Sequence, residues 1–316
     1  MRTRALGLVL GHVADRLLGD PTHHHPVAGF GTISGRLEQA MWADDRRRGI
    51  AYTAALVGGA GALGLLAERS TRSRPVLHTL ATATVTWSVL GGRSLAREAT
   101  QVRAWLDADD LPAARQHLTH LVGRDTSVLN LIGISRATVE SVAENTSDAV
   151  VAPLLAGAVA GIPGLMAYRA ANTLDAMVGH RSARHRDFGW ASARLDDVLN
   201  LVPARVSATL AAVLAPTVRG SRAKAFRTWT RDAHHHPSPN AGPVEAAFAG
   251  ALGVRLGGVN VYGNRTENRH TLGDGRPALP VDIHRALRLA KHVDTAALAL
   301  AAVIAMRPSR RQRRRR

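Results

Sequence analysis

The stretch AVVAPLLAGAVAGIPGLMA, residues 149–167, contains no charged side chain and is rich in alanine and glycine. A helix that spans a membrane needs about 20 consecutive, mostly apolar residues. Small residues also let helix backbones pack closely in lipid. The stretch therefore predicts a buried or membrane-spanning helix.

Three further runs have the same character: Ile50–Ala67, Pro75–Gly92 and Val198–Val218. The last run carries Asn200 and Arg205, so a spanning helix there has to bury or snorkel a charged side chain. The alternative is a soluble α-helical protein with buried helices, because the mean hydropathy of the chain is only −0.06.

Arginine supplies almost all of the positive charge. The formal net charge is +17, and lysine occurs only at Lys224 and Lys291. A nucleic-acid-binding protein is expected to stack bases on aromatic side chains, but only 4% of this chain is aromatic. Arginines instead flank apolar runs, as at Arg46–Arg48. This pattern favours a lipid bilayer as the partner, and no nucleic acid.

These features predict an all-α fold, a polytopic integral membrane protein with four or five apolar helices and amphipathic connecting helices. Two segments, Leu95–Leu106 and Leu111–Leu121, have the periodicity of amphipathic connectors. Arg265–Pro280 has the composition of a polar loop. Residues 1–306 are predicted to form a single membrane domain, and residues 307–316 an arginine-rich, disordered tail.

The sequence ESVAENTSD, residues 140–148, contains an acidic stripe directly before the apolar stretch at residues 149–167. Glu140, Glu144 and Asp148 recur every four residues and so lie on one face of a helix. Like charges at this spacing repel each other, which a bound cation would relieve, and oxygen ligands suit Mg²⁺. The alternative is a solvated acidic face, or one that pairs with arginines.

Two further polar groups lie beside apolar runs. Asn172 and Asp175 are three residues apart in AANTLDAMVGHR, with His180 after them. The second group, in ARLDDVLN, consists of Arg194, Asp196, Asp197 and Asn200. Polar side chains at the ends of membrane spans are costly unless they are satisfied, and they often mark function. Helix capping by the Asp or Asn side chains is the alternative.

Other motifs are weak or missing. The histidine runs His23–His25 and His234–His236 lack the spacing of zinc ligands. The sequence GAGALG, residues 59–64, fits a dinucleotide-binding pattern formally, but it lies within an apolar run, where helix packing explains it better. No standard phosphate-binding loop is present, so a nucleotide would have to be held by another arrangement of arginines and acids.

Several long segments together resemble one family. They are DRLLGDPTHHHPVAGFG (residues 15–31), VGRDTS (122–127), ESVAENTSDAVVAPL (140–154), AYRAANTLDAMVGHR (167–181), FGWASARLDDVLNLVPAR (188–205), HPSPNAGPVEAAFAGALGVRLGG (236–258) and LGDG (272–275). The chain resembles the cobalamin biosynthesis family CobD/CbiB, the adenosylcobinamide-phosphate synthases, up to about residue 294.

The resemblance implies a carbon–nitrogen ligase of the cytoplasmic membrane. Its substrates would be adenosylcobyric acid, a corrinoid, and (R)-1-amino-2-propanol or its O-phosphate, with ATP and Mg²⁺ required. The active site is expected to face the cytosol, where other membrane-bound cobalamin enzymes could be partners. The alternatives are a non-catalytic membrane sensor related to the family and a corrinoid transporter.

The chemistry implied by the resemblance assigns roles to three groups of residues. The predicted Mg²⁺ ligands are Glu144 and Asp148. The catalytic candidates, which would accept the amine proton or bind a second metal, are Asp175, Asp196 and Asp197. The predicted substrate- and phosphate-binding residues are Arg124, Asn145, Asn172, Arg194, Asn240 and Glu245.

Overall fold

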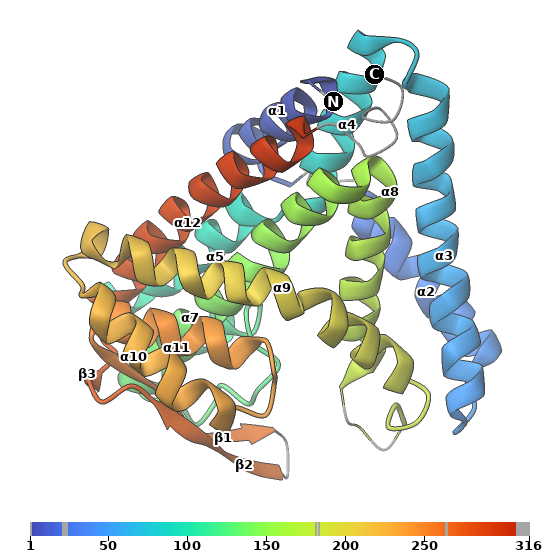
Figure 1. The fold of residues 1–316 in the computed structure, drawn as a ribbon. Helices are drawn as coiled ribbons and strands as arrows, with labels where there is room; N and C mark the ends of the chain where they lie inside the picture. Colours follow the sequence, from blue (N-terminus) through green and yellow to red (C-terminus); the bar gives the residue numbers. More distant parts are fainter. Residues whose placement is uncertain (1, 21–24, 181, 183, 263–264, 308–316) are drawn as a thin grey trace. The chain divides into compact units, whose positions relative to one another are not determined.

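The computed structural model, shown in Figure 1, describes residues 2–20, 25–180, 182, 184–262 and 265–307. The chain divides into two compact units. Unit 1 comprises Met1–Gly91, Ala152–Asn200 and Leu298–Arg316, and unit 2 comprises Gly92–Val151 and Leu201–Ala297. Each unit is described by itself.

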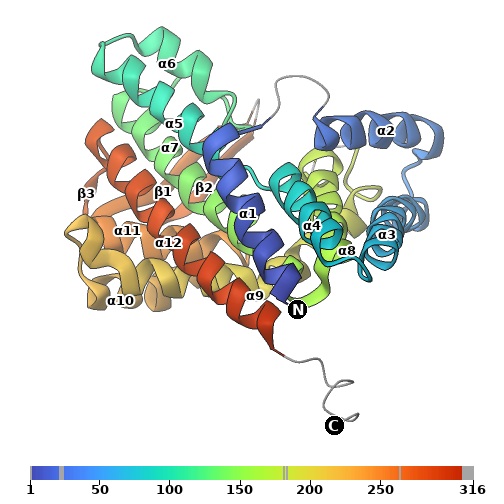
Figure 2. The same cartoon turned by 90° about the horizontal axis from the view of Figure 1, so that it is seen from above.

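Unit 1 is built from helices. They are α1 (Arg2–Leu18), α2 (Pro26–Met41), α3 (Arg46–Thr71), α4 (Pro75–Val89), α8 (Ala152–Leu174), the π-helical turn η2 (Asp175–Gly179), the start of α9 (Trp190–Leu214) and the end of α12 (Pro280–Met306). Small residues let these helices approach closely. Helix α1 lies along α4 (Figure 2), where a Cβ on Gly11 would come within 2.5 Å of the Thr86 Cβ. On α3, a Cβ on Gly64 would lie 2.7 Å from the Pro163 Cα of α8.

Helix α8 is broken within its apolar stretch. Gly161 has φ 70° and ψ −148°, a conformation open essentially to glycine alone, and Pro163 follows it. The backbone groups that the break releases find partners on other helices. Glu68 Oε2 accepts from the Ile162 N–H at 2.8 Å, and Arg4 donates to the Val159 carbonyl at 3.3 Å. An ion pair of 2.6 Å joins Arg4 to Glu68.

Unit 2 combines helices with a small sheet. Its elements are α5 (Gly92–Asp107), α6 (Leu111–Leu118), α7 (Leu131–Thr146), the π-helical turn η1 (Ser147–Val151), the rest of α9, the 3₁₀ turns η3 (Ala215–Val218) and η4 (Ala233–His235), α10 (Arg222–Asp232), α11 (Ala241–Leu252), β1 (Val254–Tyr262), β2 (Arg265–Leu272), β3 (Arg276–Pro277) and most of α12. Every residue of α11 is buried, so this helix forms the centre of the unit.

The sheet corrects one prediction. Most of the segment Arg265–Pro280, expected to be a polar loop, belongs to β2 and β3; β2 pairs antiparallel with β1, and β3 pairs parallel with it. The strand β2 reads RTENRHTL, so it lacks the alternation of apolar residues by which a half-buried strand is found. The pattern of β1 is also irregular, because Gly257 and Gly258 adopt positive φ at a register shift.

Among the described residues, four helical segments are long and apolar enough to cross a membrane: Arg46–Thr71, Leu131–Gly179, Trp190–Val218 and Pro280–Met306. The predicted all-α membrane fold is therefore confirmed, with the small sheet as an addition. The run Pro75–Gly92 gives only the 15-residue helix α4, while Pro280–Met306 was not predicted, because its first half carries several charged residues. The single-domain boundary at residue 306 stays a prediction, and residues 308–316 of the predicted tail lie outside the described residues.

Candidate functional site

A buried ion pair organises the polar interior of unit 2. Arg124 Nη2 lies 2.5 Å from Glu140 Oε2, and both side chains are almost fully buried. The other oxygen, Glu140 Oε1, accepts from the Gly257 N–H at 2.8 Å and lies 3.8 Å from Arg136 Nε. Glu140, the first residue of the acidic stripe on α7, thus connects α7 to β1 and to the loop before α7. Arg124, predicted to contact phosphate, is held in this pair.

Glu245 brings a second carboxyl group into the same interior, from the first turns of α11. Burial raises its pKa well above the usual range, and the negative charges of Glu140 and Glu144 raise it further. The His236 imidazole lies 3.7 Å from Glu245 Oε1, and both side chains are buried. Burial and the two neighbouring carboxylates therefore favour the protonated form of Glu245, and a protonated carboxyl group is able to donate a hydrogen bond.

The two predicted Mg²⁺ ligands follow Glu140 along α7. Glu144 and Asp148 are half-buried, and Asn145 beside them donates to the Ser141 carbonyl at 3.0 Å. Asp148 lies in the π-helical turn η1, and such turns occur frequently at functional sites. Two carboxylates fit Mg²⁺, which usually keeps several waters and takes one or two protein carboxylates beside substrate phosphates. Their role as ligands stays a prediction.

Asn240 provides a hydrogen-bond acceptor for Arg205, the charged residue within the apolar run of α9. Arg205 Nη1 donates to Asn240 Oδ1 at 2.9 Å, just before α11 begins. The guanidinium also donates to the Leu201 carbonyl at 3.2 Å. Arg205 is therefore satisfied by unit 2 itself, and Asn240, predicted to line the substrate site, has a structural partner in it.

A cavity of about 480 Å³ lies beside the start of α7. Apolar side chains that include Leu129, Ile132 and Leu256 share its wall with Arg136 and Arg255. Two guanidinium groups near the N-terminus of a helix suit an anionic group, and the apolar wall suits a hydrocarbon part. Neither arginine was predicted to be a site residue, because neither belongs to a known sequence motif. The glycine pair that follows Arg255 and bends β1 is the feature of the sequence that could have indicated this position.

A hydrogen-bonded chain forms the polar group of unit 1, between α8 and α9. Tyr168 Oη donates to Asn200 Oδ1 at 2.8 Å, and Asn200 Nδ2 donates to Asp196 Oδ2 at 2.9 Å. Asn172 Nδ2 lies 3.4 Å from the other carboxylate oxygen of Asp196. The structure thus brings together Asn172, Asp196 and Asn200, which the sequence analysis singled out, and adds Tyr168, which it did not.

The remaining predicted residues of unit 1 lie nearby on the same helices. Asp175 begins the π-helical turn η2, one helical turn after Asn172. Arg194 is exposed, and its Nη1 lies 3.4 Å from Asp197 Oδ2 on the same helix. The predicted residues therefore form two groups, one in each unit, which we call the polar groups. The polar group of unit 1 contains Asn172, Asp175, Arg194, Asp196 and Asp197, and the polar group of unit 2 contains Arg124, Glu144, Asn145, Asp148, Asn240 and Glu245.

Comparison with known proteins places this arrangement in a family. The sequence matches the CobD/Cbib protein family over residues 8–290. The chain belongs to this family. It is 50% identical over 307 residues, 97% of each chain, to "Cobalamin biosynthesis protein CobD" of Mycobacterium tuberculosis. Proteins of the same name from Geobacter metallireducens and Chromobacterium violaceum are each 42% identical, with 89% and 95% of this chain covered.

No solved structure matches the chain significantly. The region that matches the CobD/Cbib family contains every predicted site residue, from Arg124 to Glu245, and both polar groups. It also contains the cavity lined by Arg136 and Arg255. All of these candidate site residues therefore lie in the part of the chain, residues 8–290, that matches the family.

Proposed function

We propose that this chain is an adenosylcobinamide(-phosphate) synthase, a carbon–nitrogen ligase of cobalamin biosynthesis. It would join (R)-1-amino-2-propanol, or its O-phosphate, to the free propionate of adenosylcobyric acid and consume ATP. The observation that carries the proposal is the 50% identity, over 97% of both chains, to a protein named for cobalamin biosynthesis.

The proposed reaction needs an activated acid. A carboxylate is a poor electrophile, so a propionate oxygen first attacks the γ-phosphorus of ATP, and ADP leaves. The amine nitrogen then attacks the carbonyl carbon of the acyl phosphate, phosphate leaves, and the nitrogen loses a proton. The protein's part in phosphoryl transfer is chiefly to position the groups and neutralise charge.

The half-buried Glu144 and Asp148 are the residues proposed to hold Mg²⁺, which when bound neutralises charge on phosphate oxygens. Arg194 is exposed on α9, so its guanidinium is accessible to a phosphate group. Arg124 would contribute more indirectly, because its ion pair with Glu140 positions α7, the helix that carries Glu144.

The amine proton needs an acceptor. Asp196 is our first candidate, because Asn200 and Asn172 approach its two oxygens and fix the orientation of the carboxylate. Asp175 and Asp197, on the same two helices, are the other candidates. Asn145, Asn172, Asn240 and Glu245 are proposed to line the substrate site, where amide and carboxyl groups match the amide side chains of a corrinoid.

The proposed location is the cytoplasmic membrane, with the active site on the cytosolic side. Four helices that could cross a membrane support a multi-pass protein. ATP and the large corrinoid are supplied from the cytosol, so the site must open there. Other membrane-bound enzymes of the same pathway are natural partners for the exchange of such a substrate.

A ligation assay tests the proposal. Protein in detergent is incubated with adenosylcobyric acid, ATP, Mg²⁺ and aminopropanol with or without its O-phosphate, and the product is followed by mass. We expect an ATP-dependent gain of the aminopropanol mass. No product from folded protein, with an active relative run in parallel, would favour a sensor or, if the corrinoid crosses vesicles unchanged, a transporter.

Two variants and a control locate the site. The double variant Glu144→Ala/Asp148→Ala is expected to lose turnover, as is Asp196→Asn, which keeps the shape of the side chain. Asp44→Asn serves as the control, because Asp44 is an exposed acid that belongs to neither polar group. Full turnover of a folded Glu144→Ala/Asp148→Ala protein would contradict the Mg²⁺ assignment.

A further inference from the structure

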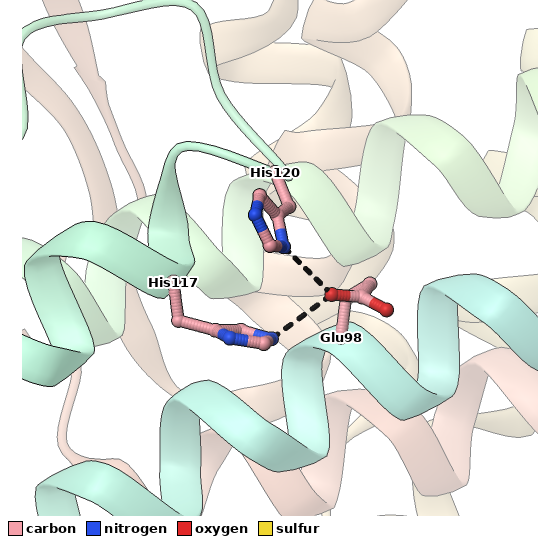
Figure 3. Close-up of side chains that lie close together, drawn as sticks. All are labelled: Glu98, His117 and His120. Carbon is pink, nitrogen blue, oxygen red and sulfur yellow. Dashed lines mark hydrogen bonds and ion pairs between the residues drawn. The ribbon is translucent and has the colours of Figure 1, made fainter.

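A carboxylate and two imidazoles converge at helices α5 and α6 of unit 2 (Figure 3). Glu98 comes from α5, His117 from the last turn of α6, and His120 from the turn that follows. One ligand atom from each residue lies within 4.8 Å of the others. We infer that Glu98, His117 and His120 form a binding site for a divalent transition-metal ion, with Zn²⁺ as the type case.

The distances suit a metal ion after a small adjustment. Glu98 Oε2 lies 2.9 Å from His117 Nε2 and 3.0 Å from His120 Nδ1. Ligands at about 2.1 Å from a tetrahedral Zn²⁺ are about 3.4 Å from one another. The carboxylate oxygen therefore has to retreat by a few tenths of an ångström. Side-chain rotation must also set the two imidazole nitrogens, which lie within 4.8 Å of each other, at the same spacing.

The backbone and a neighbouring arginine hold the three groups in place. The His120 N–H donates to the His117 carbonyl at 3.1 Å, so a single turn presents both imidazoles to the same side. Arg97 Nε donates to Glu98 Oε1 at 3.0 Å, which leaves Oε2 directed at the histidines, as Figure 3 shows. Hydrogen bonds that fix the second oxygen of a carboxylate are typical of metal sites.

An ion pair with Glu98 does not satisfy the hydrogen-bonding capacity of His117 Nε2. His117 Nε2 is shielded from solvent and makes no aligned hydrogen bond, although Glu98 Oε2 lies only 2.9 Å away. The same oxygen already receives the His120 ring. A buried nitrogen without an aligned partner is costly in a hydrogen-bonded pair but is satisfied by a metal ion. The His120 side chain is 58% exposed and gives the ion an entry path and a position for water.

The donor set indicates the class of ion. Two imidazoles and one carboxylate suit Zn²⁺ and its transition-metal neighbours, whereas Mg²⁺ prefers oxygen ligands alone. The site is thus distinct from the one proposed for Glu144 and Asp148. Because its ligands come from α5 and from the end of α6, a bound ion would fix this helical hairpin, and its role is structural.

Metal binding is measured on the full chain in detergent after removal of metal by a chelator. Co²⁺ is added first, because its visible absorption reports imidazole ligation, and Zn²⁺ content is then measured by elemental analysis after equilibrium dialysis. We expect one tightly held ion per chain, lost in His117→Asn/His120→Asn. In Glu98→Gln the affinity should fall at least about 100-fold, beyond the effect of removing an outer partner.

The matched control removes two histidines elsewhere. His234→Asn/His235→Asn deletes two exposed imidazoles that are not part of the proposed site, and it should keep the tight ion. Zn²⁺ should also raise the Tm of the wild-type and control proteins but not that of His117→Asn/His120→Asn. The inference is overturned if that variant, with a wild-type elution profile and metal-free Tm, retains the ion, or if only the control loses it.

Discussion

Glu140 and Arg124 are both buried, and the charge of each compensates the free-energy cost of burying the other. Removal of one partner from a buried pair leaves an uncompensated charge and typically costs about 3–5 kcal/mol. Glu140→Gln keeps an acceptor for the Gly257 N–H but removes the charge that Arg124 needs. We expect a marked fall in the Tm of the detergent-solubilised protein.

The double variant Glu140→Gln/Arg124→Met completes the test. It removes both charges of this pair and keeps the acceptor, so its Tm should exceed that of Glu140→Gln alone, because the buried Arg124 charge is removed together with that of Glu140. Arg124→Met alone is measured as well. If the fall in Tm of the double variant equals the sum of the falls of the two single variants, the pair is not coupled in the way the 2.5 Å contact indicates.

Glu245 predicts a pH dependence of stability. Its pKa is raised in the folded protein by burial and by the neighbouring carboxylates, so the folded state retains a proton that the unfolded chain releases above pH 4.5. Stability from this group is present below that pH and is lost as pH rises towards the folded pKa, by up to about 1.4 kcal/mol per pH unit.

Glu245→Gln imitates the protonated side chain and removes this dependence. We expect the Tm of the wild-type protein to fall, relative to that of the variant, as pH rises from 5 to 8. Thermal melts of both proteins across this range give the difference directly. Parallel Tm profiles would mean that Glu245 does not hold its proton in the fold.

At the scale of elements, the break in α8 depends on one glycine. A Cβ on Gly161 would come within 2.2 Å of Glu68 Oε2, and a side chain is strained at its φ of 70°. Strain of this kind costs of order 1–3 kcal/mol. Gly161→Ala is therefore expected to lower the Tm and to displace Glu68 from the Ile162 N–H.

A second substitution separates strain from lost hydrogen bonding. Glu68→Ala leaves the Ile162 N–H and Arg4 without their acceptor but creates no clash. Glu68→Ala is therefore expected to lower the Tm through the lost hydrogen bond and ion pair alone. A wild-type Tm for Glu68→Ala would show that water replaces the carboxylate.

The elements that could be predicted from sequence are those whose apolar residues follow one period. The runs at Ile50–Ala67 and Val198–Val218 became α3 and α9, and the amphipathic segments became α5 and α6. The break at Gly161 was not predictable, because it depends on Arg4 and Glu68, which are distant in sequence. The strand β2 was missed because pairing with β1, and not its own composition, sets its conformation.

At the scale of the whole molecule, the types of site residue could be predicted better than their partners. Spacing along one helix identified the stripe of Glu140, Glu144 and Asp148, but only the fold shows that Glu140 is held by Arg124 and approaches Glu245. The cluster of Glu98 with His117 and His120 was missed for the same reason: the histidines are suitably spaced, but their carboxylate comes from another helix.

The last prediction concerns the orientation of the chain in the membrane. The chain has no cysteine, so single cysteines can be labelled without background. Ser127 is exposed shortly before the candidate span Leu131–Gly179, and His180 is exposed directly after it. Glu144 and Asp148 lie in the first half of this segment and Asp175 lies near its end. The proposed cytosolic location of these acids predicts that both ends of the segment face the cytosol.

Ser127→Cys and His180→Cys should therefore react with an impermeant maleimide only in inverted vesicles. The segment Leu131–Gly179 would then enter and leave on one side, and its 49 residues are long enough for this, because a single crossing needs about 20. Labelling of one cysteine from outside the intact cell and of the other from inside would mean that the segment crosses once. The proposed cytosolic location would then not hold for both ends of the segment, and the catalytic assignment would have to be restricted to one of the two polar groups.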